Sequence, residues 1–514
     1  MDRIIAGLPG DYMSPCIFEG TVMTTIADEP ISIAHPDKLF VDGAWIDTAS
    51  SRRLDLVNPA TEGVFMSVVA ADVEDVHRAV AAARRAFDKG PWPRMSPQER
   101  ATTLDALAAA LTERTHELAH CWTRQMGAPF AMAQQGTTAG IGFIGMNTGL
   151  IDQVQWTKEM PTVFPGSKGM LVAEPVGVVA AIAPWNGPLF LMLVKIAPAL
   201  LAGCTVILKP APETPLEAYI LAECAEAVGF PAGVINLLPA ETDVANELVL
   251  HPDVDKVSFT GSTAAGRKIA SEVGARIGRV TLELGGKSAA IVLDDYDMAT
   301  AAQNLAYTIA NLTGQFCTNL TRILVPRARK DEFVSAMAAA MRGLKVGDPY
   351  DPDTYLGPTA GKRHLDKVMS YIEKGKSEGV LAVGGGRPEG LDRGFYVEPT
   401  LFVDVDNSAV ISREEIFGPV ACVITYETLD EAIEIANDTI YGLAGSVFTN
   451  DAEAAYRVAR GVRTGTIAQN GLKFDFSIGF GGFKQSGLGR EGGVRGVEHY
   501  LEYKTVILDD KEAA

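Results

Sequence analysis

Two short segments bring a thiol and a carboxylate into settings where both could take part in one reaction. Glu283 opens the run ELGGKSAA at 283–290, and Cys317 follows in the run TGQFCTNLTR at 313–322. A thiol can form a covalent thioester, and a carboxylate can activate the water that hydrolyses it. The two segments therefore predict covalent catalysis, with Cys317 as the nucleophile and Glu283 as the general base.

The composition is that of an ordinary acidic globular protein. The chain has 514 residues, 47% of them hydrophobic and 21% charged, which suits two or three domains. Its net charge of −19, without any basic block, argues against nucleic acid as a partner. Six cysteines show no CxxC spacing, and seven histidines include no HxH or HExxH motif. We therefore expect a reduced, cytoplasmic protein without a metal site.

One uncharged stretch, 175–194, is long enough to be mistaken for a membrane span. Three prolines and two glycines interrupt it, so we expect a buried strand, a turn and the start of a helix, and no membrane segment. The apolar run near the N-terminus is too short for a signal peptide. Because the first 36 residues are unlike the rest, we expect a loose N-terminal arm over 1–36.

Short apolar strands alternate with helical segments along most of the chain. Helical periodicity appears first over 73–87 and 97–118. Strands are then predicted at 176–183, 204–209, 233–238, 256–260 and 279–283, with helices at 188–202, 214–228, 243–250 and 263–274. After Ser288 a second series follows, with strands near 321–325, 420–425, 443–448 and 465–469. Such alternation predicts an α/β fold with two doubly wound parallel sheets, and a ligand site where they meet.

Six motifs in fixed order resemble those of the aldehyde dehydrogenase superfamily, over a match from about Leu39 to the C-terminus. They are PWN at 184–186, FTGS at 259–262, ELGGK, GQxC, EIFGPV at 415–420 and FGGFKxSGLGREGG at 480–493. The resemblance implies NAD(P)-dependent oxidation of an aldehyde to the carboxylic acid through a thiohemiacetal and a thioester on Cys317. Because Glu283 is present, it argues against the branch of the family that transfers the acyl group to coenzyme A.

The resemblance also implies a domain layout and an assembly. An NAD(P)-binding domain would span 37–154 and 175–285, and a catalytic domain 286–485. Residues 155–174 and 496–510, including the extended tail EHYLEYKTVIL, would pair as a small β oligomerisation flap. We therefore expect a homo-oligomer, either a dimer or a tetramer.

Further site residues follow from the same motifs. Asn186 is either a turn residue or, as the resemblance implies, a donor to the oxyanion beside the Cys317 N–H. Lys209 is either a solvated strand-end lysine or a donor to the adenosine ribose. The remaining expected cofactor contacts are Trp185, Gly261, Ser262, Glu415 and Phe417.

The cofactor phosphates have one good candidate site in the sequence. In FTGSTAAG at 259–266 a strand ends at Gly261, and Ser262 or Thr263 can cap the next helix, whose N-terminus suits a pyrophosphate. Two literal GxGxxG matches, at 140–145 and 487–492, lack the preceding strand that a dinucleotide fingerprint requires. A triphosphate-binding loop is excluded because Arg267 and Lys268 stand where Gly-Lys would be needed.

Three positions depart from the family pattern. Many relatives carry a ribose-binding Glu three residues after the lysine, where this chain has Pro212, with Glu213 one place later. This departure leaves both NAD and NADP as cofactors. Residues 239–252 lack the usual Gly-x-Gly, and Gly479 replaces a proline before FGG.

The residues expected at the substrate entrance carry no charge. They are Gly187, Leu191, Val194, Phe316, Thr318 and Phe480, with Phe474 and Phe476 either near the mouth or in the core, and the small-residue run 136–142 beside them. This lining favours an apolar aldehyde, whether medium- or long-chain, terpenoid or aromatic. The alternatives are a semialdehyde or amino-aldehyde dehydrogenase, or a catalytically idle structural relative. A cysteine hydrolase is disfavoured because no histidine lies in a recognisable motif.

Overall fold

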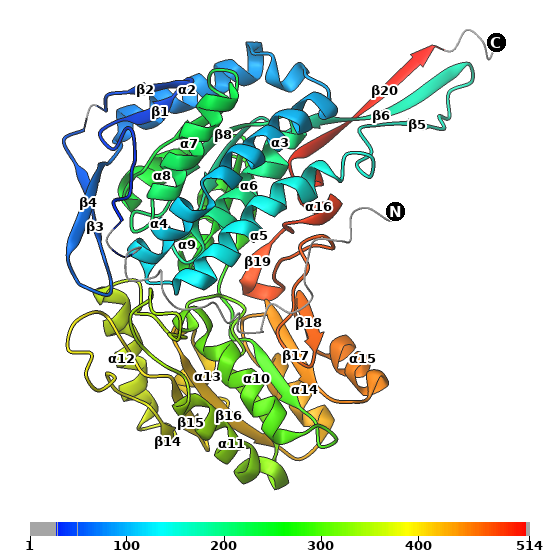
Figure 1. Cartoon of the computed structure of the whole chain (residues 1–514). Coiled ribbons are helices and arrows are strands. Elements are labelled where there is room, and N and C mark those ends of the chain that lie inside the picture. The colour runs from blue at the N-terminus through cyan, green and yellow to red at the C-terminus, as the bar shows by residue number, and fades with distance from the viewer. Residues whose placement is uncertain (1–26, 28, 49, 510–514) are drawn as a thin grey trace.

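The computed structural model describes residues 27, 29–48 and 50–509. Two α/β lobes lie one above the other in Figure 1, and a narrow three-stranded sheet extends from the upper one. The predicted α/β class with two doubly wound sheets is confirmed.

The first lobe is built on an eight-stranded sheet. Its order is β19 (Gly487–Leu488), β11 (Arg279–Glu283), β10 (Lys256–Thr260), β7 (Val178–Ile182), β8 (Thr205–Lys209), β9 (Ile235–Leu237), β1 (Leu39–Val41) and β2 (Ala44–Ile46). The central five strands are parallel, while β1, β2 and β19 pair antiparallel. All five strands predicted for this region are therefore present.

Helices cover both faces of this sheet because its central strands are apolar on both sides. On one face lie α2 (Val73–Lys89), α8 (Thr242–Leu250) and α9 (Thr263–Ala275), packed on Val178 and Ala180. On the other lie α3 (Pro97–Glu113), α5 (Phe130–Thr148), α6 (Pro188–Ala202) and α7 (Leu216–Val228), packed on Val179 and Ala181. Alternate residues of one strand thus enter separate cores.

The second lobe holds a seven-stranded sheet. Its order is β14 (Val380–Val383), β15 (Thr400–Val403), β16 (Val420–Tyr426), β13 (Arg322–Pro326), β12 (Ala289–Val292), β17 (Ala444–Phe448) and β18 (Thr466–Gln469). Helices α10 (Met298–Ala310) and α11 (Lys330–Arg342) cover one face, and α12 (Lys362–Gly375), α13 (Val410–Arg413), α14 (Leu429–Asn437) and α15 (Ala452–Gly461) the other.

Sequence patterns missed some of these elements. Strands β12, β14 and β15 have four residues each, too few for a clear pattern. The stretch 97–118 is not one helix, because the chain bends at Arg114 between α3 and α4 (Thr115–Met126). At this bend the Arg114 guanidinium forms ion pairs with Glu117 and Glu223.

A three-stranded sheet forms the extension seen in Figure 1. Strand β20 (Leu501–Asp509) runs antiparallel to β6 (Ser167–Pro175), and β6 pairs with β5 (Thr157–Met160). The predicted pairing of the C-terminal tail with this hairpin is confirmed. A separate hairpin of β3 (Arg53–Val57) and β4 (Val64–Val69) and the short helix α16 (Gly493–Glu498) complete the larger elements.

The N-terminal segment is anchored where the structure describes it. Ile31 and Ile33 are buried in the first lobe, and the Ala34 N–H donates to Glu223 at 2.9 Å. The expected loose arm is therefore wrong for this stretch, because two apolar side chains enter the core. Residues 1–26 and 28 of that arm lie outside the described residues. Among the helices described, none is long and apolar enough to cross a membrane.

Candidate active site

The turn that carries Cys317 has an unusual backbone. After α10 the chain forms the short helix η2 (Asn311–Gly314), in which Leu312, Thr313 and Gly314 all have positive φ, at 49°, 54° and 72°. A side chain at Gly314 would stand 2.2 Å from the carbonyl carbon of Gly418, so only glycine fits there. This turn leaves part of Cys317 exposed, whereas Cys121, Cys204, Cys224 and Cys422 are buried.

The thiol of Cys317 lies in an environment that favours its neutral form. Burial raises its pKa well above the ordinary value, and the nearby carboxylates of Glu415 and Glu283 raise it further. A thiolate nucleophile therefore needs a group that removes the proton, or a cation that enters with a ligand.

Glu283 ends strand β11, and its carboxylate lies in the interior at the junction of the lobes. Neither of its oxygens has a hydrogen-bond partner among the described residues. Burial and the Glu491 carboxylate raise the pKa of Glu283 well above its usual range, while Lys195 and Arg490 lower it. A partnerless buried carboxyl with a raised pKa suits a group that takes up a proton during catalysis.

Asn186 connects the first lobe to the nucleophile turn. It lies in the loop between β7 and α6, and its amide Nδ2 donates to the Gln315 carbonyl at 3.0 Å. The Gln315 side chain in turn binds the Leu312 carbonyl and the Ala360 N–H. One N–H of the Asn186 amide is therefore fixed against the turn, and the other stays available. Within the described residues the Cys317 N–H donates to no backbone carbonyl.

The groups expected to hold a dinucleotide lie at the ends of neighbouring strands. Lys209 ends β8, and its amino group has no hydrogen-bond partner among the described residues, while burial lowers its pKa to about 8. After β10, the Gly261 N–H donates to the Glu283 carbonyl at 3.0 Å. The Ser262 hydroxyl accepts from the Ala265 N–H and caps α9, as predicted.

Glu415 and Phe417 enter the site from the second lobe. Glu415 Oε1 accepts from the Gly286 N–H at 3.0 Å, and burial raises the pKa of this carboxyl. A side chain at Gly285 would collide with Glu415 Oε2, at 2.3 Å. The Phe417 ring packs edge-on against Trp185, with centroids 5.4 Å apart. The ELGGK run thus leaves room for Glu415 beside Cys317.

A model of the aldehyde dehydrogenase family matches residues 45–506 of this chain. The chain belongs to the aldehyde dehydrogenase family. It is an NAD(P)-dependent aldehyde dehydrogenase.

Three relatives are similar to this chain over nearly their whole length. The geranial dehydrogenase of Castellaniella defragrans is 45% identical over 471 residues, which cover 91% of this chain and 98% of the relative. The aldehyde dehydrogenase of Mycobacterium tuberculosis solved with NAD+ is 44% identical, with a TM-score of 0.89 over 92% of this chain and 98% of its own. Aldehyde dehydrogenase C of Pseudomonas syringae, solved as a variant with NAD+ and octanal, is 39% identical, with a TM-score of 0.90 over 95% and 100%.

A buried ion pair beside Glu283 was not anticipated from the sequence of this aldehyde dehydrogenase. Lys195 Nζ in α6 donates to Glu491 Oε1 at 2.8 Å and to Thr260 Oγ1 at 2.7 Å. The side chains of Lys195 and Glu491 are 0% and 4% exposed. A single charge inside the apolar helix PLFLMLVKIAPALLA was the available signal, because a buried lysine needs a partner.

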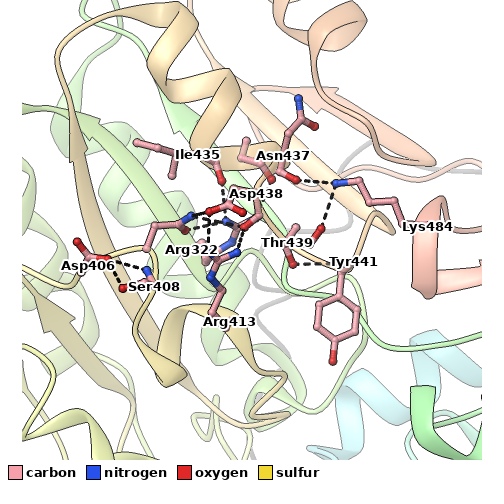
Figure 2. Close-up of polar contacts among 12 residues, drawn as sticks. Arg322, Asp406, Ser408, Arg413, Ile435, Asn437, Asp438, Thr439, Tyr441 and Lys484 are labelled. Carbon is pink, nitrogen blue, oxygen red and sulfur yellow. Dashed lines mark hydrogen bonds and ion pairs between the residues drawn. The ribbon is translucent and has the colours of Figure 1, made fainter.

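A second unanticipated group, Arg322, binds the backbone of the ELGGK run from the second lobe. Its guanidinium donates to the carbonyls of Lys287, Ile435 and Ala436, which ties the ELGGK run to the end of α14. Figure 2 shows Arg322 beside Ile435 at that helix end. Lys484 donates to the Asn437 carbonyl at 2.7 Å at the same helix end. Cations at a helix C-terminus satisfy carbonyls that have no partner within the helix.

The residues expected to line the substrate entrance differ in how far they are buried. Gly187 precedes α6, and a side chain there would meet only Leu191, at 3.6 Å. Phe316 is partly buried, Thr318 and Phe480 are buried, and Val194 has no exposed surface and lies within the core.

Five phenylalanine rings form one cluster beside this lining. Phe476 stacks on Phe480 with centroids 4.8 Å apart, and its edges meet Phe143, Phe190 and Phe474. Phe474 is 50% exposed, and its ring also contacts that of Phe480, which is 8% exposed. Phe143 and Phe190 were not anticipated from the sequence, because they lie in helices whose apolar residues all resemble core.

Two sequence interpretations change with the structure. In the run 136–142, a side chain at Gly136 would strike the Trp122 ring at 2.5 Å, and one at Gly140 would lie 3.0 Å from the Phe190 backbone. These two glycines therefore serve helix packing and not a tunnel. Gly479 has a φ of 136°, which proline cannot adopt, so the departure at that position changes the backbone itself. No cluster suited to a metal ion occurs within the part of the chain that the structure describes.

Proposed function

We propose that this aldehyde dehydrogenase oxidises apolar aldehydes to carboxylic acids with NAD+, through a thioester on Cys317. The observation that carries the proposal is a partly exposed thiol on a strained turn, beside a buried carboxylate without partners and an amide anchored to the same turn. These are the nucleophile, base and oxyanion donor that acyl chemistry requires.

The first half of the reaction builds the covalent intermediate. The Cys317 thiol loses its proton to solvent, and the sulfur attacks the aldehyde carbon. The carbonyl π-electrons move to the oxygen, and the second N–H of Asn186 together with the Cys317 N–H stabilises the resulting alkoxide. The alkoxide then reforms the carbonyl as the carbon loses a hydride, leaving a thioester. NAD+, when bound, accepts that hydride.

The second half hydrolyses the thioester. Glu283 removes a proton from water, and the hydroxide adds to the acyl carbon, where the same two donors stabilise the oxyanion. The carbon–sulfur bond breaks and the acid leaves, and Glu283 gives its proton to the Cys317 sulfur, which regenerates both groups. Glu283 suits this proton transfer because the pKa of its carboxyl is raised by burial and by Glu491.

The residues present fit a dinucleotide. Lys209 offers a buried amino group at the end of β8, near the Glu213 carboxylate, and the capped N-terminus of α9 after Gly261 offers backbone N–H groups suited to a pyrophosphate. Glu415 and Phe417 would bind the nicotinamide ribose, with Trp185 behind them. NADP is an additional cofactor candidate, because Pro212 supplies no carboxylate to repel a phosphate on the ribose.

The substrate class follows from the lining. We expect the substrate to approach past Leu191 and the phenylalanine cluster, and none of the residues expected there is charged. A geranial dehydrogenase and an octanal complex among the relatives support a long-chain or terpenoid aldehyde. A semialdehyde or amino-aldehyde would need a charged partner that this lining lacks.

We also place the enzyme in the cytoplasm, as a homodimer or homotetramer. Free cysteines suit a reducing compartment. The extension of β5, β6 and β20 exposes apolar side chains, among them Val163 at 90% and Leu508 at 54%, which a second copy would cover.

The test is NADH absorbance on mixing the protein with NAD+ or NADP+ and a panel of aldehydes. We expect octanal and geranial to exceed acetaldehyde and succinic semialdehyde in kcat/KM. Absence of NADH formation with every aldehyde would contradict the proposal, and a preference for the charged semialdehyde would contradict the substrate class.

A further inference from the structure

Three aromatic side chains from separate segments meet at the wall of the site. Trp185 comes from the loop after β7, His364 from the first turn of α12, and Phe417 from the loop before β16. The ring centroids of His364 lie 5.2 Å from those of Trp185 and 5.9 Å from those of Phe417, at steep interplanar angles of 64° and 78°. Each pair therefore makes an edge-to-face contact.

His364 is also hydrogen-bonded to the backbone of Phe417. Its Nε2 lies 2.6 Å from the Phe417 carbonyl oxygen, which can only accept, so Nε2 carries the proton. Burial is the main cause that lowers the pKa of His364 to about 4; Lys367, one turn along the helix, contributes in the same direction, and the hydrogen bond to the Phe417 carbonyl opposes it. The ring is thus a neutral imidazole with one fixed tautomer at physiological pH.

The backbone that His364 holds is strained. Phe417 has a φ of 65°, a conformation that a bulky residue rarely adopts. The next residue, Gly418, is enclosed on two sides: a side chain at 418 would meet Val368 of α12, and one at Gly314 would meet Gly418 itself. The strained segment therefore lies between α12 and the turn that carries Cys317. Strain of this kind persists only where neighbouring groups hold it.

We propose that His364 is a positioning residue for cofactor binding. Its Nε2–H holds the Phe417 carbonyl, and its ring supports Trp185, so that the Phe417 ring stands at a fixed place relative to Cys317. This inference rests on the proposed function, because it assumes that the nicotinamide ribose binds against the Phe417 ring.

Three substitutions separate the hydrogen bond from the ring contacts. His364→Phe keeps an aromatic ring without a donor, His364→Gln keeps an N–H donor without the ring, and His364→Ala removes both. His77→Ala is the matched control, since His77 is a half-exposed histidine on α2. Calorimetric titration with NAD+ gives Kd for each protein without requiring turnover, and thermal melting shows that each variant is folded.

We expect the Kd for NAD+ to rise about fivefold to tenfold in His364→Phe and more in His364→Ala, as the loss of one buried hydrogen bond implies. His364→Gln should recover most of the affinity, while the KM for octanal stays unchanged in all variants. Equal Kd values in wild type, His364→Phe and His364→Ala would overturn the inference, as would full affinity in His364→Phe with none recovered in His364→Gln. Wild type that binds NAD+ but oxidises no aldehyde would contradict the proposed function and leave the Kd comparison intact.

Discussion

Enlarging residue 187 should change the size preference of the enzyme without disturbing its fold. Gly187 has a φ of −144°, which any residue can adopt, and a side chain there would meet only Leu191, at 3.6 Å and 3.7 Å. We expect the Gly187→Phe ring to enter the space that the substrate chain would occupy. Each buried methylene contributes about 0.8 kcal/mol, close to a fourfold change in kcat/KM. A ring that displaces three methylenes of the substrate should then reduce the preference for octanal over acetaldehyde by about sixtyfold.

The assay is kcat/KM for acetaldehyde, butanal, hexanal and octanal, with geranial as a branched member. Gly274→Phe is the matched control, because Gly274 also faces open space but lies on α9. We expect the control to keep the wild-type order. If Gly187→Phe also keeps it, or if acetaldehyde is already the best substrate of wild type, Gly187 does not face the aldehyde and the argument fails.

Three further predictions concern buried charges and one glycine. Lys195→Met should lower the free energy of unfolding by about 3–5 kcal/mol, because it leaves Glu491 buried without its cation, and replacing Glu491 by Leu in the same chain should recover much of the loss in urea titrations. Gly481→Ala should slow acid release, because its methyl group would lie 2.7 Å from Glu283 Oε1; steady-state kcat equal to wild type would contradict this. Burial raises the pKa of Glu217 to about 8, so the folded state binds the extra proton and the free energy of unfolding falls as pH rises from about 4.5 to 8, by at most ~1.4 kcal/mol per pH unit. Glu217→Gln should remove this slope, and an unchanged slope would refute the assignment.

Much of the fold could be predicted because its strands are short, apolar and separated by helices of ordinary length. Strands such as β7, β8, β10 and β11 are bounded by turn residues, so the apolar pattern and the turn residues predict the same strand ends. Strand β12 could not be found in this way, because its four residues follow directly on the ELGGK run. The bend at Arg114 depends on ion pairs with a residue far along the chain, which no local pattern contains.

The residues of the candidate site likewise fall into those that a local motif predicts and those that it does not. Cys317, Glu283 and Asn186 lie in short motifs, and the structure places them around one turn. His364 and Lys195 carry no motif, because their roles depend on partners more than fifty residues away in the sequence. Gly136 and Gly140 show the opposite error, since small residues suit a tunnel and close helix packing equally well until the neighbouring side chains are known, whereas Gly142 faces open space.

Capture of the acyl intermediate tests the central claim most directly. Glu283→Gln removes the base for thioester hydrolysis, so this variant should accumulate acyl-enzyme when mixed with NAD+ and octanal. Mass spectrometry of its peptides should then show one octanoyl group, on the peptide that contains Cys317, and none in Cys317→Ala. An octanoyl group on another cysteine, or NADH formed without any acylated peptide, would contradict covalent catalysis through Cys317.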